Sequence, residues 1–128
     1  MVLLDTCALV WWTLDPHKLS HAASKACGEI ETFGGFISSI SLWEIGIKIK
    51  KGRLDINITL EEYVSRLNQI EGLEIIPVDE NIWAKNISLD WPHKDPADRT
   101  IVATAILKDL SIVSKDRGIK DFYPKIIW

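Results

Sequence analysis

Short, uniformly apolar runs alternate along the chain with longer segments in which apolar residues recur at helical spacing. The short runs predict β-strands over residues 2–4, 36–39, 73–78, 110–113 and 125–127. The longer segments predict helices over residues 6–13, 19–30, 41–52, 59–72, 79–89 and 95–108, and a loop over 115–118. Strands that are apolar on both faces and alternate with helices are typical of a central parallel sheet covered by helices on each side. The expected fold class is therefore α/β.

Length and composition fit one globular domain over residues 1–128, because 47% of the residues are hydrophobic, 26% are charged, and no repeat or linker interrupts the pattern. The longest uninterrupted apolar run covers residues 7–12. A bilayer needs roughly 20 such residues, so no membrane span is expected. Asp5 interrupts the apolar start and no basic region precedes it, so we expect no signal peptide and a cytoplasmic location.

Two acidic residues follow predicted strands closely. Asp5 comes directly after the first strand, and Asp116 comes shortly after the strand over 110–113. Folds of this class bind ligands beyond the carboxyl ends of their strands, so both side chains are candidate site residues. Asp is also common in turns and at helix caps, and that alternative applies to each residue taken singly.

Two further acidic residues occur near the starts of predicted helices. Glu44 follows Ser41 at capping-box spacing, and Asp98 follows Asp95-Pro96, which is typical of a helix start with an N-cap Asp and a proline in the first turn. Capping alone would explain both acids. Apolar residues share one helix face with Asp98 at Ile101, Val102 and Ala105. Asp98 is therefore expected to point toward the sheet.

Four carboxylates at one sheet edge raise one another's pKa, and a divalent cation removes that conflict. Mg²⁺ prefers oxygen ligands of this kind and can activate water for phosphoryl transfer. The net charge of −3 argues against a nucleic-acid-binding protein unless the acids surround such a cation. His17, His21 and His93 show no metal-ligand spacing, Cys7 and Cys27 form no zinc pattern, and no glycine-rich phosphate loop occurs.

The motifs resemble those of the PIN-domain ribonucleases, and their length and order are similar in particular to the VapC toxins of toxin–antitoxin pairs. Four motifs carry the resemblance: Leu3-Leu4-Asp5-Thr6, Ser41-x-x-Glu44, Asp95-Pro96-Ala97-Asp98-Arg99 followed by Ala103 and Ala105, and Ser114-Lys115-Asp116. Together, in this order, they cover nearly the whole chain.

The resemblance implies a three-layer PIN-like fold and Mg²⁺- or Mn²⁺-dependent endonucleolytic cleavage of RNA. It also implies a homodimer and inhibition by a cognate VapB-like antitoxin. Asp5, Glu44, Asp98 and Asp116 match the catalytic, metal-binding acids of the family. Four further residues match supporting positions: Thr6 and Ser114 as hydroxyls near the metal, and Asp95 and Arg99 in an extended motif of one subgroup.

Other interpretations stay open at this point. A non-catalytic interaction module of the same fold would use Trp11 and Trp12 as partner-binding anchors, although burial in the core also explains these residues. A phosphatase of the haloacid dehalogenase type needs a second Asp two residues after the first, where this chain has Cys7. The basic run over residues 48–53 is either an RNA backbone contact or a solvated helix end.

Overall fold

A parallel five-stranded sheet forms the centre of the computed structural model, which describes residues 1–128. Its strands are β1 (Val2–Leu4), β2 (Gly35–Ser38), β3 (Leu73–Ile76), β4 (Ser111–Val113) and β5 (Ile126–Ile127), in the order β3-β2-β1-β4-β5. The helices are α1 (Thr6–Leu14), α2 (His21–Gly28), α3 (Ile30–Phe33), α4 (Ser39–Lys50), α5 (Leu60–Asn68), α6 (Glu80–Ser88), α7 (Pro96–Lys108) and α8 (Arg117–Phe122), with the 3₁₀ turn η1 (Pro16–Lys18) after α1. None of the helices is long and apolar enough to cross a membrane.

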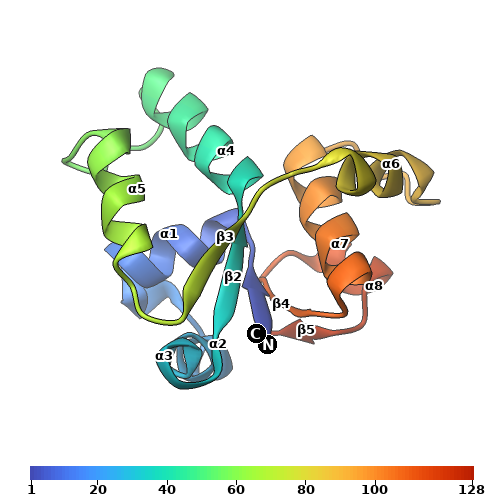
Figure 1. The fold of residues 1–128 in the computed structure, drawn as a ribbon, viewed down its shortest axis with the longest axis horizontal. Coiled ribbons are helices and arrows are strands. Elements are labelled where there is room, and N and C mark those ends of the chain that lie inside the picture. Colours follow the sequence, from blue (N-terminus) through green and yellow to red (C-terminus); the bar gives the residue numbers. More distant parts are fainter.

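Each face of the sheet has its own hydrophobic core. Leu4 of β1 and Val113 of β4 pack with residues of α1, α2 and α5, whereas Leu3 and Ile112, one position earlier on the same strands, pack with residues of α6, α7 and α8. Figure 1 shows these two groups of helices on opposite sides of the sheet. Neighbouring strand residues point to opposite faces, so a strand buried on both faces must be apolar throughout. The expected α/β class is confirmed.

The strand order places a topological switch point at the middle of the sheet. The chain moves from β1 to β2 to β3 in one direction and then returns to place β4 on the other side of β1. The N–H of Asp5 donates to the carbonyl of Val113 at 3.1 Å, so the β1–β4 ladder continues past the end of β1. The segments that follow β1 and β4 diverge beyond this point, which is where folds of this class bind ligands.

The start of α4 differs from the capping box expected at Ser41 and Glu44. The helix begins at Ser39, and its N-cap is Ser38, whose Oγ accepts from the N–H of Ile40 at 3.1 Å. Because β2 ends at Ser38, the chain passes from strand to helix without a loop, and the cap falls three residues earlier than expected. Ser41 is buried inside the helix, so the capping box expected for Glu44 is wrong.

Two other helical segments also differ from expectation. The single helix expected over 19–30 is divided at Glu29 into α2 and α3, directly after the weak helix former Gly28. The loop expected over 115–118 is correct only for residues 115 and 116, because Asp116 is the N-cap of α8 and residues 117 and 118 are helical. Only six residues form α8, too few for apolar periodicity to reveal a helix.

Candidate metal centre

The four acids singled out from the sequence line one cavity of about 440 Å³ at the carboxyl ends of the strands. Asp5 follows β1, Glu44 lies on α4, Asp98 lies in the first turn of α7, and Asp116 caps α8. The same cavity is lined by Thr6, Cys7, Trp11, Lys48, Asp95 and Lys115. Segments more than 100 residues apart in the chain thus contribute acids to one site, because β1 and β4 are neighbours in the sheet.

Asp5 is the most buried of these acids, with an exposed fraction of 5%. Its Oδ1 accepts from the N–H of Ala8 at 2.8 Å, which caps α1, and its Oδ2 accepts from Oγ of Ser114 at 2.5 Å. Oγ of Ser114 also accepts from the N–H of Asp116 at 3.0 Å. Ser114 therefore links the two acids that follow the central strands. Thr6 instead hydrogen-bonds Ser41 at 2.9 Å, which joins α1 to α4.

Burial and neighbouring charges make ionisation of Asp5 and Asp98 costly. Desolvation raises the pKa of Asp5 to about 6, and the charges of Asp98 and Asp116 act in the same direction against the hydrogen bonds from Ser114 and Ala8. Burial also raises the pKa of Asp98. The charges of Asp95 and Asp116 add to this rise, and the hydrogen bond with His93 opposes it. A site that holds carboxylates against this cost is suited to a cation.

Three of the four acids lack a partner of opposite charge that would otherwise explain their grouping. The ion pairs of the protein join Lys18 to Asp15 and Lys125 to Asp109, and Nε2 of His93 lies at hydrogen-bond distance, 2.8 Å, from Oδ2 of Asp98. Asp5, Glu44 and Asp116 have no such partner. Unpaired carboxylates with oxygen donors directed at one cavity fit the ligand preference of Mg²⁺ and Mn²⁺.

Capping and ligand binding are compatible at this site. Asp116 accepts from the N–H of Ile119 through Oδ1 at 2.9 Å, and its second carboxylate oxygen is not used by the cap. Asp95 is the N-cap of α7, where its Oδ1 accepts from the N–H groups of Ala97 and Asp98 at 2.9 and 3.1 Å. The capping explanation is thus correct for these two residues, but it accounts for only one oxygen of each carboxylate.

The inward face expected for Asp98 is confirmed. Ile101, Val102 and Ala105 are all fully buried against the sheet. Asp98 lies at the start of this face, where α7 meets the cavity, and its side chain is partly exposed. The same residues that bury the helix therefore direct the carboxylate toward the ends of the strands.

His93 lies beside the acids, although its spacing along the chain gave no indication of this. Its Nε2 is 2.8 Å from Oδ2 of Asp98, and the donor atoms of His93, Asp98 and Asp116 all lie within 4.8 Å of one another. His93 and Asp98 are five residues apart across a helix start, a separation that matches no metal-binding motif. Only the path of the loop before α7 brings the ring to the acids.

Arg99 does not line the cavity. Its guanidinium donates to the backbone carbonyls of Asn86, Leu89, Trp91 and His93, and also to the side chain of Asn86. Several charge-assisted hydrogen bonds from one side chain hold the segment between α6 and α7 in place. Arg99 is therefore a positioning residue for this loop.

Trp11 and Trp12 line different hollows. Trp11 borders the acidic cavity, where its ring packs against Trp128 with 5.7 Å between centroids and lies near the ammonium groups of Lys18 and Lys115. Trp12 packs against the core beside α5. The most exposed tryptophans are Trp43 and Trp83, at 57% and 45%, and the sequence did not single them out.

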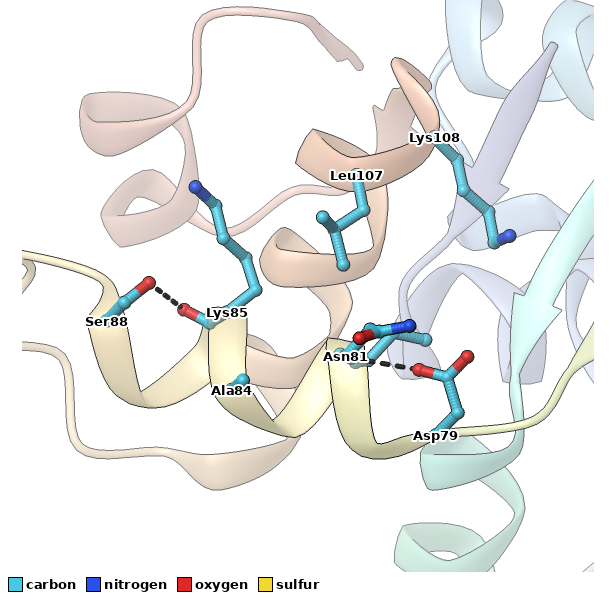
Figure 2. A pocket seen from close by; sticks show the side chains of 8 residues that line it. Asp79, Asn81, Ala84, Lys85, Ser88, Leu107 and Lys108 are labelled. Carbon is cyan, nitrogen blue, oxygen red and sulfur yellow. Dashed lines mark hydrogen bonds between the residues drawn. The ribbon is translucent and has the colours of Figure 1, made fainter.

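The largest hollow of the protein is elsewhere, between α6 and α7, and measures about 570 Å³. Figure 2 shows Lys85 and Lys108 at its sides, with Leu107 between them. Asp79 caps α6 there through the N–H of Ile82 at 2.9 Å. None of the four clustered acids reaches this hollow, so size alone does not identify the site.

Comparison with known proteins gives concordant results. A family model described as PIN domain matches residues 2–124. Ribonuclease VapC22 of Mycobacterium tuberculosis is 30% identical to this chain over an alignment of 132 positions, which covers 99% of this chain and 98% of that protein. Because the family model covers nearly the whole chain, the phosphatase alternative is unnecessary.

Solved structures share the architecture. A toxin–antitoxin complex from Klebsiella pneumoniae is 21% identical with a TM-score of 0.69, covering 100% of this chain and 97% of that chain. VapBC2 from Rickettsia felis, bound to a promoter DNA fragment, is 20% identical with a TM-score of 0.67, covering 99% and 96%. FitAcB from Neisseria gonorrhoeae is 22% identical with a TM-score of 0.66, covering 98% and 93%. At these identities the likeness shows the fold alone.

Proposed function

The chain belongs to the PIN-domain family, with a VapC ribonuclease among its relatives, and on that premise we propose that it is a metal-dependent endoribonuclease. In this proposal Asp5, Glu44, Asp98 and Asp116 hold Mg²⁺ or Mn²⁺. The reaction is hydrolysis of internal RNA phosphodiester bonds. The protein is the toxin of a VapBC-type pair and acts on cellular RNA in the cytoplasm.

One observation carries the proposal: four acids from separate elements meet at the switch point, and three of them have no cationic partner. A divalent cation bound there would supply a Lewis acid that activates water and offsets negative charge on the phosphate. The protein contributes the placement. Ser114 and the N–H of Ala8 hold both oxygens of Asp5, and the α8 cap orients Asp116.

Basic and aromatic side chains beside the acids are suited to a single-stranded nucleic acid. Lys48 and Lys115 line the cavity together with Trp11. An adjoining hollow is lined by Trp11, Lys48 and Arg53. Ammonium and guanidinium groups contact phosphates, and an indole ring stacks on a base, a combination that binds single strands with little sequence preference. This arrangement favours the backbone-contact interpretation of the 48–53 run.

A VapB-like antitoxin is the proposed partner, and a homodimer is the proposed assembly. Structurally similar proteins include a toxin–antitoxin complex and VapBC2, which supports this choice of partner. Trp11 borders the acidic cavity, so an antitoxin segment over this ring would cover the site directly. Antitoxin capture should therefore weaken in Trp11→Ala. Undiminished capture by both Trp11→Ala and Trp12→Ala would exclude this docking face.

Amide substitution of each acid tests the activity. Asp5→Asn, Glu44→Gln, Asp98→Asn and Asp116→Asn should each lose RNA cleavage in Mg²⁺ or Mn²⁺ while keeping the parent's circular dichroism spectrum. Asp79→Asn is the matched control, because Asp79 also caps a helix but lies at the distant hollow. EDTA should abolish cleavage by the parent and by this control. Wild-type rates in Asp5→Asn and Asp98→Asn would show that the acids are not the reactive centre.

A further inference from the structure

His93 brings a nitrogen donor to the carboxylates. Its Nε2 is 2.8 Å from Oδ2 of Asp98, and the donor atoms of these two residues and Asp116 lie within 4.8 Å of one another. Two atoms bound to one cation at about 2.1 Å are about 3 Å apart when adjacent and about 4 Å apart when opposite. Small side-chain rotations therefore suffice for all three residues to share one ion.

The His93 ring is held in place by a layered set of contacts. It packs against Trp91 with 4.7 Å between ring centroids, and Trp91 stacks on Phe122 of α8 at 4.8 Å with 10° between the planes. The backbone carbonyls of Trp91 and His93 both accept from Nη1 of Arg99. A ring fixed on both its backbone and its face loses little conformational entropy when it binds a ligand.

We propose that His93 is a ligand, through Nε2, of the cation held by Asp98 and Asp116. The inference rests on the proposed function, since it takes a cation at this sheet edge as its premise. Ligation requires the neutral ring to carry its proton on Nδ1, so that the Nε2 lone pair faces the ion. Mn²⁺ also favours oxygen ligands, but as a transition-metal ion it accepts a neutral imidazole nitrogen more readily than Mg²⁺, which gives up its waters reluctantly. His93 therefore biases the centre toward Mn²⁺ over Mg²⁺.

Pulsed electron paramagnetic resonance of the Mn²⁺-loaded full chain detects directly bound nitrogen. The parent should show a nitrogen coupling that is absent in His93→Gln. The chain has 3 histidines, so the double variant His17→Gln/His21→Gln keeps His93 as the only one and should retain the coupling. This double variant assigns the signal even where His93→Gln folds poorly. In a competition titration, the ratio of Mg²⁺ to Mn²⁺ dissociation constants should fall about tenfold in His93→Gln.

The outcomes separate this inference from the proposed function. Mn²⁺ binding without a nitrogen coupling in the parent would overturn the ligand role and leave the four-carboxylate site intact, with His93 as a hydrogen-bond partner of Asp98. A coupling that persists in His93→Gln, or is lost in the double variant, would also overturn it. Absence of Mn²⁺ binding by the parent would overturn both proposals.

Discussion

Asp5 should lower the stability of the metal-free protein at neutral pH. Burial raises its pKa from the ordinary 3.8 to about 6, so the folded state binds the carboxyl proton more tightly than the unfolded state does. The contribution of Asp5 to the unfolding free energy therefore falls as pH rises from about 4 to about 6 and stays reduced above that window. One pH unit corresponds to about 1.4 kcal/mol, so the full loss at pH 7 is about 3 kcal/mol.

The substitution Asp5→Asn removes this ionisation and keeps the local geometry. The amide oxygen can accept from the N–H of Ala8, and the NH₂ group can donate to Oγ of Ser114, which has lone pairs available. Asn is also about as good an N-cap as Asp. The variant should match the parent within about 0.5 kcal/mol below pH 4 and exceed it by about 3 kcal/mol at pH 7.

Urea unfolding followed by circular dichroism, in metal-depleted buffers between pH 4 and pH 7, measures this difference. The difference between variant and parent isolates residue 5 from the other titrating groups, and Asp79→Asn controls for amide substitution at a helix cap. Mn²⁺ added at pH 7 should stabilise the parent by about 2.7 kcal/mol at a concentration one hundred times Kd, and the variant by less. A difference that does not change with pH would refute the reasoning.

Three further predictions concern residues around the site and the sheet. In metal-free buffer Asp116→Asn should melt at or above the parent's temperature, because the variant keeps the α8 cap and relieves repulsion between carboxylates. Asp116→Ala should be less stable than Asp116→Asn by about 1 kcal/mol, because it loses the cap. A lower melting temperature for Asp116→Asn than for the parent would contradict the repulsion. Arg99→Lys should lower the unfolding free energy by about 2 kcal/mol and accelerate amide hydrogen exchange over residues 89–94, because lysine lacks the planar guanidinium that donates to several carbonyls of this loop. Unchanged exchange would show that Arg99 does not hold the loop in place. Gly72→Ala should lower the unfolding free energy by about 2 kcal/mol or more in thermal melts, because φ of Gly72 is +83° and the new Cβ would lie 2.2 Å from the backbone oxygen of Ile30 in α3. Gly28→Ala is the control and should not destabilise the protein, because no atom lies within 4 Å of the added Cβ.

The local pattern of the chain determined most of the elements. Helix α7 begins and ends where Asp95-Pro96 and the apolar spacing predicted, and β1 has its expected bounds. The acids after the strands were also identifiable, because a carboxylate that follows a buried parallel strand lies at the edge where ligands bind. Burial of one face of a helix or of both faces of a strand produces a regular spacing of apolar residues. The elements can therefore be predicted without knowledge of contacts between distant parts of the chain.

The prediction from local sequence was wrong at the start of α4, where the N-cap depends on the end of the preceding strand. Ser38, Ser39 and Ser41 all lie near the start of α4, and each is an acceptable N-cap by type. The end of β2 selected Ser38. Ser41 was left to hydrogen-bond Thr6 across the α1–α4 contact, and Glu44 was left to face the cavity.

Only the tertiary structure decided how the site is completed. Oγ of Ser114 meets Asp5 across 109 positions of the chain, because β1 and β4 are neighbours in the sheet. His93 meets Asp98 because Arg99 and Trp91 shape the loop before α7. Periodicity reports which face of an element is buried, but strand order and loop path depend on contacts between elements distant in the chain. The sequence therefore specified the acids, whereas the packing of the sheet and the loop decided which side chains join them.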